Sequence, residues 1–107
     1  MRTAKGHFEI RMAPETLSAT ASETGIGRMS FSKTFAGALV GQSEGEMLGF
    51  RNLSSGAGGY VAMETVRGAL DGRQGSFVLQ HSSVMEHGAA RQVIEVVPGS
   101  GTNELAR

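Results

Sequence analysis

Tyr60, Glu64 and His81 are the side chains whose types and spacing point most directly to chemistry. They lie on two runs of alternating residues that meet at Asp71-Gly72, a dipeptide typical of two-residue β-hairpin turns. Such a turn would bring all three side chains to one face of the hairpin, with Glu64 and His81 diagonal to each other. A carboxylate held among apolar residues can act as a general acid or base, and His81 or Tyr60 would then steer the proton.

The predicted hairpin has a defined register, with the cross-strand pairs Leu70–Arg73, Gly68–Gly75, Val66–Phe77, Glu64–Leu79, Ala62–His81 and Tyr60–Ser83. The face that carries Glu64 is mostly apolar, so we expect it to be buried and expect Glu64 to need a polar partner. Lys33 is a candidate, because it lies on a core-facing stripe between Phe31 and Phe35. The alternative to a catalytic Glu64 is therefore a structural one, either hydrogen-bonded or in an ion pair with Lys33. The alternative for Lys33 is a stem that lies over apolar surface while the amine reaches water. A three-residue turn would instead place Glu64 opposite Gln80.

The composition favours one small all-β domain spanning residues 1–107. The chain has 16 glycines and only 2 prolines, and glycine suits the turns and kinks of sheets but not helices. Ten basic residues balance ten acidic ones, so we expect no nucleic-acid partner and no attraction to a membrane. The absence of cysteine excludes disulfides and thiol catalysis. With no signal-peptide pattern and no long apolar segment, the expected location is the cytoplasm.

Alternation of residue types predicts six strands, which cover residues 6–12, 28–39 and 40–50, the two arms of the hairpin, and residues 90–97. Pro14 is expected to end the first strand and to begin a surface loop that reaches residue 27 and has room for one helical turn. Residues 52–58 should form the loop that leads into the hairpin. The last strand carries apolar side chains on both faces, so its second face should be covered by a loop or by another subunit.

Six strands with short connections predict a small antiparallel β-barrel or a sandwich. Strands of this number and length barely surround a core, and they leave two edges open to pairing with another chain. We therefore expect a homo-oligomer, or another cover for the two edges.

Four segments carry a family resemblance: AKGHFEIRM near the N-terminus, SEGEML at 43–48, GYVAMETVRGALDGRQGSFVLQHSSVM at 59–85 and VVPGSGTNELA at 96–106. They resemble an uncharacterised bacterial family, domain of unknown function family 3224, which is similar in fold to the allene oxide cyclase barrel. The resemblance implies a barrel with a mouth and an apolar cavity, and it implies no activity. Members of the family continue beyond the position of Leu105 with further strands, so the expected barrel is incomplete at the C-terminus. Two expectations follow: either the sequence is a truncated product, or oligomerisation closes the barrel because a partner chain fills the gap.

Three further patterns are expected to carry no function. Residues 41–45 match Gly-x-Ser-x-Gly, but that motif requires a turn from a strand into a helix, whereas this segment lies in an all-β pattern. His7, His81 and His87 lack the short same-face spacing of a metal site. The glycines of residues 56–59 lack the lysine and the helix of a phosphate loop. We expect neither a metal nor an organic cofactor.

The leading functional hypothesis is a binding module whose cavity accepts a small apolar or amphipathic molecule. The expected lining residues are Phe31, Lys33, Phe35, Tyr60, Glu64, Val66, Phe77, Leu79 and Gln80. Methionines on several strands would let such a cavity adapt to varied ligands. The first alternative is a cofactor-independent cyclase or isomerase that uses Glu64, with His81 and Tyr60, for proton transfer. The second is a structural protein whose barrel is filled by side chains.

Overall fold

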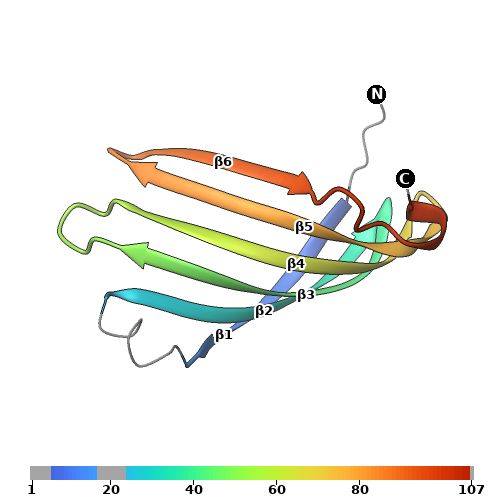
Figure 1. Ribbon diagram of the computed structural model, residues 1–107, viewed down its shortest axis with the longest axis horizontal. Helices are drawn as coiled ribbons and strands as arrows, with labels where there is room; N and C mark the ends of the chain where they lie inside the picture. The colour runs from blue at the N-terminus through green and yellow to red at the C-terminus, as the bar shows by residue number, and fades with distance from the viewer. Residues whose placement is uncertain (1–5, 17–23, 107) are drawn as a thin grey trace.

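The protein is a single antiparallel sheet of six strands joined in chain order (Figure 1). The computed structural model describes residues 6–16 and 24–106. The strands are β1 (Gly6–Glu15), β2 (Ile26–Gly37), β3 (Leu39–Arg51), β4 (Gly58–Leu70), β5 (Arg73–Glu86) and β6 (Ala89–Val96). A short 3-10 helix, η1 (Asn103–Leu105), follows and contacts β5. No described residue belongs to a helix that is long and apolar enough to cross a bilayer.

The hairpin of β4 and β5 has the register that the sequence predicts. Leu70 pairs with Arg73, and the ladder continues to Glu64 opposite Leu79 and beyond. The turn residues Asp71 and Gly72 have φ angles of 50° and 80°, which is the left-handed conformation that a two-residue turn of this type requires. The alternative register with a three-residue turn is thereby excluded.

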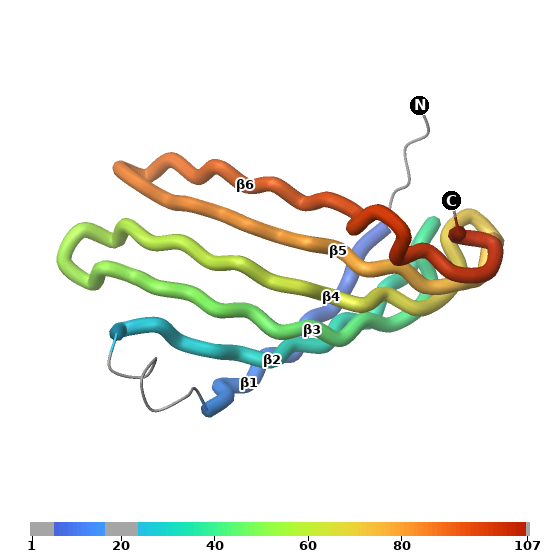
Figure 2. The backbone as a smooth tube through the Cα atoms, viewed as in Figure 1, coloured from blue at the N-terminus to red at the C-terminus, as the bar shows by residue number. Residues whose placement is uncertain are grey.

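One face of the sheet, which we call the inner face, holds all the buried side chains of the described residues: Phe31, Ser43, Ala62, Glu64, Val66 and His81. The registers of β2 to β5 place these residues on the same side of the pleat. Because the sheet is a single layer, the burial arises from the sheet curling over its own face. The backbone trace shows the twist that produces this curl, with β1 crossing obliquely behind the later strands (Figure 2).

A glycine on β3, Gly45, allows the sheet to curl over its inner face. Gly45 lies opposite both Phe31 of β2 and Glu64 of β4. A Cβ atom at Gly45 would lie 2.5 Å from the tip of the Phe31 ring and 2.5 Å from the backbone oxygen of Met63. The glycine thus makes room for an aromatic ring to lie over the centre of the sheet.

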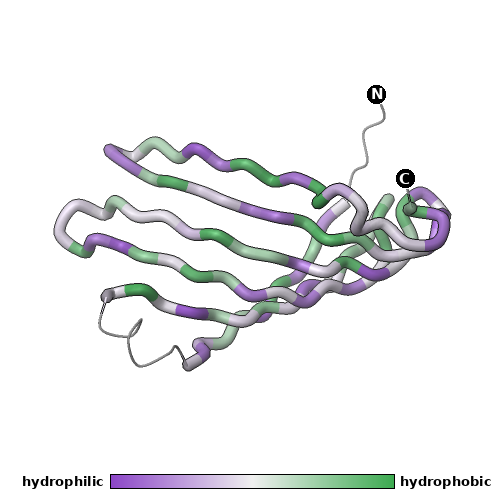
Figure 3. The backbone as a smooth tube through the Cα atoms, viewed as in Figure 1, coloured by the Kyte–Doolittle hydropathy of each residue, from purple (hydrophilic) through white to green (hydrophobic). Residues whose placement is uncertain are grey.

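The sheet is open, so the expected closed barrel does not form from the described residues. β1 and β6 are its two edges and do not pair with each other. Every residue of both strands is exposed, and Figure 3 shows both hydrophobic and hydrophilic stretches along β6. The physical reason is that six strands with this curvature bury only the middle of the inner face.

The first strand is longer than the sequence predicts. Pro14 does not end β1, which continues to Glu15 with Pro14 opposite Met29 of β2. β1 is an edge strand, where the missing N–H of proline is tolerated. The predicted loop after it lies partly in residues 17–23, outside the described residues. The loop between β3 and β4 occurs as expected, with the side-chain oxygen of Asn52 accepting hydrogen bonds from the backbone of Ser54 and Ser55.

Candidate functional site

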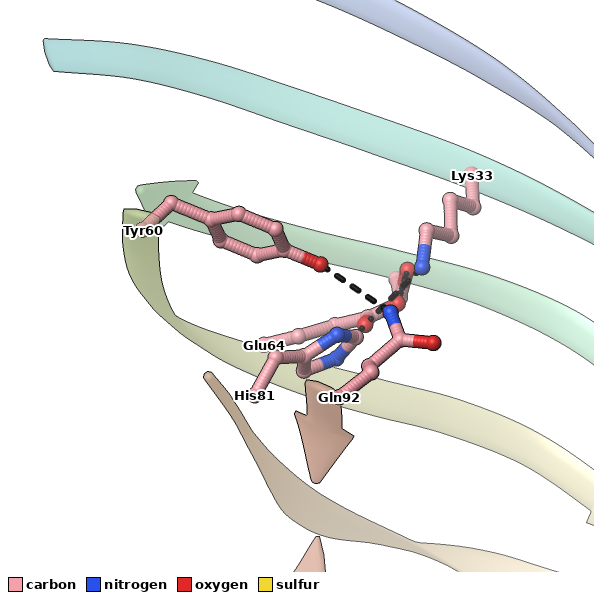
Figure 4. A network of polar contacts seen from close by, with 6 residues as sticks. Lys33, Tyr60, Glu64, His81 and Gln92 are labelled. Carbon is pink, nitrogen blue, oxygen red and sulfur yellow. Dashed lines mark hydrogen bonds and ion pairs between the residues drawn. The ribbon is translucent and has the colours of Figure 1, made fainter. Parts of the chain in front are cut away.

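The candidate site is built around Glu64, whose side chain has no exposed surface. Three groups donate hydrogen bonds to its carboxylate: Lys33 Nζ to Oε1 at 3.1 Å, His81 Nε2 to Oε1 at 2.8 Å and Ser43 Oγ to Oε2 at 2.5 Å. The imidazole is the donor in its bond because a carboxylate has no proton to give. Figure 4 shows the Lys33 ammonium and the His81 ring converging on Glu64. We call these four residues the Glu64 cluster.

Strand registers bring the Glu64 cluster together from four strands. His81 of β5 lies opposite Ala62, so it is diagonal to Glu64 on β4. Lys33 of β2 lies opposite Ser43 of β3, and Ser43 is in turn diagonal to Glu64. Every member occupies the inner face, where a long lysine side chain can span the strand between itself and the carboxylate.

Aromatic rings flank the Lys33 ammonium. Its Nζ lies 4.7 Å from the ring centroid of Phe8 and 5.3 Å from that of Phe31, both within range of cation–π attraction. The rings of Phe8 and Phe35 pack against each other, with their centroids 5.6 Å apart. The cation is therefore held by a carboxylate on one side and by aromatic faces on the others.

Each buried polar atom of the cluster has a partner. No buried side-chain nitrogen or oxygen among the described residues lacks a hydrogen-bond partner. A carboxylate on Glu64 and an ammonium on Lys33 balance in charge, as buried ionic groups require. The Lys33–Glu64 ion pair that the sequence predicts as one alternative is therefore present, and whether Glu64 also takes part in catalysis stays a prediction.

Most of the predicted lining residues share the inner face with Glu64. Phe31, Lys33, Phe35, Tyr60, Val66, Phe77 and Leu79 all follow the same side of the pleat. Gln80 does not, because the two-residue turn places it opposite Met63 on the other face, where it is exposed. Gln80 is thus separated from the other candidates by the register itself.

Tyr60 is not bonded to Glu64. Its hydroxyl accepts a hydrogen bond from the side-chain amide of Gln92 on β6 at 3.1 Å (Figure 4). Tyr60 lies two inner-face positions from Glu64 along β4, so it borders the cluster without joining it. The structure therefore connects Glu64 with His81, but not with the third member of the predicted catalytic group.

Ser43, Phe8 and Gln92 are contributors that the sequence did not single out as site residues. Ser43 drew attention only through the Gly-x-Ser-x-Gly pattern, and it lies inside β3 with its hydroxyl turned to Glu64. That position is no strand-to-helix turn, so the pattern is a coincidence of sequence. The usable signal for Ser43 was its place in the inner-face alternation of β3. Among the described residues, no group of three His, Asp or Glu side chains is arranged to hold a metal ion.

A hollow of about 530 Å³ opens on the inner face, at the end of the sheet beside the loop that joins β3 to β4. Its lining includes Met29, Met47, Tyr60 and Met85, with Gly49 on the floor and Leu53 on the loop. Arg51 is its only charged lining residue and makes no ion pair with any described residue. The hollow and the Glu64 cluster meet at Tyr60.

The fold and site define a class: a single-sheet, all-β protein with a buried ionic cluster on its inner face and an apolar hollow beside it. The family described as "Protein of unknown function (DUF3224)" matches residues 4–107. The chain therefore belongs to this family.

A crystal structure of a protein with unknown function from the same family, from Shewanella oneidensis MR-1, is similar to this chain. The two share 48% sequence identity with a TM-score of 0.87, and the match covers 97% of this chain and 79% of that one. Among curated proteins, no match to the chain was found. The similarity to allene oxide cyclase that the sequence suggested stays a prediction.

Proposed function

We propose that the protein binds a small amphipathic molecule in the hollow beside the Glu64 cluster. The observation that carries this proposal is the lining of the hollow, which includes three methionines, a tyrosine and one cation, Arg51, that forms no ion pair with a described residue. Methionine side chains are flexible and polarisable, so such a wall adapts to varied apolar shapes. A few polar groups on an otherwise apolar wall are typical of small-molecule sites.

The charge on the lining favours a ligand with an anionic end. An apolar chain would lie against Met29 and Met47, and its acidic end would reach Arg51, which is exposed at the rim. Arginine suits a carboxylate because its donors form a planar fork. Glu64 contributes indirectly: it fixes Lys33 and His81 and thereby keeps the floor beside the hollow rigid.

The test compares two probes of equal chain length, dodecanoate and dodecan-1-ol, by thermal unfolding and native mass spectrometry. Binding to the folded state raises the unfolding temperature, so dodecanoate should raise it more than the alcohol does. Arg51→Gln should remove the difference between the probes while retaining the response to the alcohol. The absence of both a thermal shift and a retained mass for either probe would refute the proposal.

Gly49→Leu tests whether the hollow is where the probes bind. A Cβ atom at Gly49 meets nothing closer than 3.4 Å, and Gly49 has no left-handed φ angle, so a leucine can enter the hollow without backbone strain. It should abolish the response to both probes. Ala36→Leu is the matched control, because it adds the same side chain at an exposed position of β2 outside the lining. An equal loss in both variants would show that the hollow is not the site.

A second candidate function is proton transfer without a cofactor, and it is supported by the 2.8 Å contact between His81 and Glu64. His81 does not line the hollow, so in this form a ligand in the hollow extends past Tyr60 to reach His81, whose side chain is 9% exposed while that of Glu64 is fully buried. Glu64→Gln should then leave the dodecanoate response intact and abolish conversion of whatever molecule is retained in native mass spectrometry. Conversion is measured as a change in chromatographic retention at constant mass. Conversion unchanged by Glu64→Gln would refute this second function.

A further inference from the structure

A polar groove crosses the outer face of the sheet, the side opposite the inner face that holds the Glu64 cluster. It consists of two adjoining hollows of about 520 Å³ and 450 Å³, which share Glu44, Thr65 and Arg67 in their linings. A twisted sheet is saddle-shaped, so a face that is convex in one direction is hollowed along the diagonal. All lining residues belong to β1, β2, β3 and β4, and the groove involves neither free edge of the sheet.

The strand registers align a row of polar residues across this groove. Arg11 of β1 lies opposite Ser32 of β2. On the other side of Ser32 lies Glu44 of β3, which in turn lies opposite Thr65 of β4. Arg67 follows two residues after Thr65 on β4, so it lies on the same face. The charges along this diagonal therefore alternate: the guanidinium of Arg11, the carboxylate of Glu44 and the guanidinium of Arg67.

None of these three charges is paired within the part of the chain that the structure describes. Arg11, Glu44 and Arg67 form no ion pair and no side-chain hydrogen bond with a described residue. The fourth charged residue of the lining, Glu46, differs from them because it forms an ion pair with Arg28. Two arginines and one glutamate are thus available to a ligand in the groove.

The spacing of the two arginines suits a short ligand with two acidic ends. Their strands are three strand spacings apart, about 14 Å, and each long side chain can turn inward over the groove. The two guanidinium groups then leave room for two carboxylates, each held by the planar fork of one arginine. Glu44 lies between them, where it repels a plain dicarboxylate and attracts a ligand that carries a positive group between its acidic ends.

We propose that the outer-face groove binds an α-amino dicarboxylate such as aspartate or glutamate. One carboxylate contacts Arg11, the other contacts Arg67, and the ammonium group contacts Glu44. This inference goes beyond the function proposed for the hollow, because the groove and the hollow lie on opposite faces of the sheet and share no lining residue.

Three probes of similar size test the charge pattern by NMR titration of the full chain: glutamate, glutarate and glutamine. Glutarate keeps both carboxylates but lacks the ammonium group, and glutamine keeps the ammonium group but lacks one carboxylate. Glutamate should bind with a dissociation constant about tenfold lower than that of either other probe, and it should shift the backbone amide signals of Ser32 and Thr65. Equal affinities for the three probes would indicate unspecific ionic attraction and would overturn the proposal.

Arginine substitutions test where glutamate binds. Arg11→Gln and Arg67→Gln should each raise the dissociation constant for glutamate about tenfold, because each removes one carboxylate contact. Both residues are exposed, so folding should be unaffected, and circular dichroism verifies this. Arg91→Gln is the matched control, because Arg91 is an exposed arginine of the outer face that lies on β6, outside the groove. An equal loss of affinity in the control, or no loss in either groove variant, would contradict the assigned site.

Glu44→Gln separates the proposed site from a general site for anions. The substitution should raise the dissociation constant for glutamate about tenfold and lower that for glutarate, because the carboxylate attracts the ammonium group of one probe and repels the other probe. The variant should therefore prefer glutarate. An unchanged preference for glutamate would overturn the proposal, as would the absence of any NMR shift when millimolar glutamate is added to the wild-type chain.

Discussion

Glu64→Gln should strongly destabilise the protein, although Glu64 lies on an open, single-layer sheet. The substitution keeps the shape of the side chain and removes its charge, which leaves the Lys33 ammonium without its carboxylate. The side chain of Lys33 is only 11% exposed, so water replaces the lost partner poorly. Removing one partner of a buried ion pair costs about 3–5 kcal/mol.

One retained contact reduces that cost. The amide oxygen of a glutamine can still accept one hydrogen bond, from Lys33 or from Ser43, which is worth about 1 kcal/mol. The rings of Phe8 and Phe31 lie within 5.3 Å of the Lys33 Nζ in both proteins, so they hold the cation in place but do not change the difference. We therefore expect Glu64→Gln to lower the free energy of unfolding by about 2–4 kcal/mol. For a domain of this size that corresponds to a decrease of about 10 °C or more in the unfolding temperature.

The matched control is Glu46→Gln on β3. Glu46 also forms an ion pair, with Arg28, but that pair lies on the outer face with side chains 35% and 56% exposed. The same chemical change should cost less than about 1 kcal/mol there. Urea unfolding followed by circular dichroism measures both variants, and a loss for Glu64→Gln no larger than that for Glu46→Gln would refute the reasoning.

A double variant separates the ion pair from the other bonds of Glu64. Lys33→Met in the Glu64→Gln background removes the unpaired cation, while Ser43 and His81 keep their contacts. The double variant should be less destabilised than the sum of the two single variants, by about 1 kcal/mol or more. If the losses in the two single variants simply add up to the loss in the double variant, the ammonium is stabilised by its aromatic neighbours and not by the carboxylate.

Three further substitutions test the packing around the site by urea unfolding. Gly45→Ala should cost about 1–3 kcal/mol, because the added methyl group collides with the ring of Phe31; a neutral result would show that the ring is free to move. Gly72→Ala should cost about 1–2 kcal/mol, since the residue has a φ of 80°, and an unchanged stability would contradict the assigned turn. Tyr60→Phe removes only the hydrogen bond from Gln92 and should change stability by less than about 1 kcal/mol; a larger loss would indicate that Tyr60 supports the cluster directly.

The sequence predicts the parts of the fold that depend on local signals. The Asp71-Gly72 turn sets the β4–β5 register, and that register alone brings His81 to Glu64. The Lys33–Glu64 pair could be anticipated because both residues lie on apolar stripes. Its geometry, however, also depends on the β2–β3 and β3–β4 registers, which no comparable turn signal fixes.

The misjudged features depend on where a segment lies in the finished sheet. Pro14 is a strand breaker in the interior of a sheet and is tolerated in β1 because β1 is an edge, a fact that no local pattern contains. Phe8 reaches Lys33 only because β1 pairs with β2. The sequence predicts a closed barrel, whereas the sheet is open. The reason is that alternation shows which face a residue occupies, but not how strongly the whole sheet curves.

The composition of the buried centre explains why the edges and the hollow matter for this protein. Among the described residues, the buried set consists of the apolar Phe31, Ala62 and Val66 and the polar members Ser43, Glu64 and His81. Polar groups that satisfy one another specify the register of the strands but add little net stability. The apolar side chains that could add it, such as Phe8 on β1 and Ile94 on β6, are about half exposed at the two edges. The cluster thus fixes how the strands align, and covering the edges and the hollow would supply the apolar burial that the isolated sheet lacks.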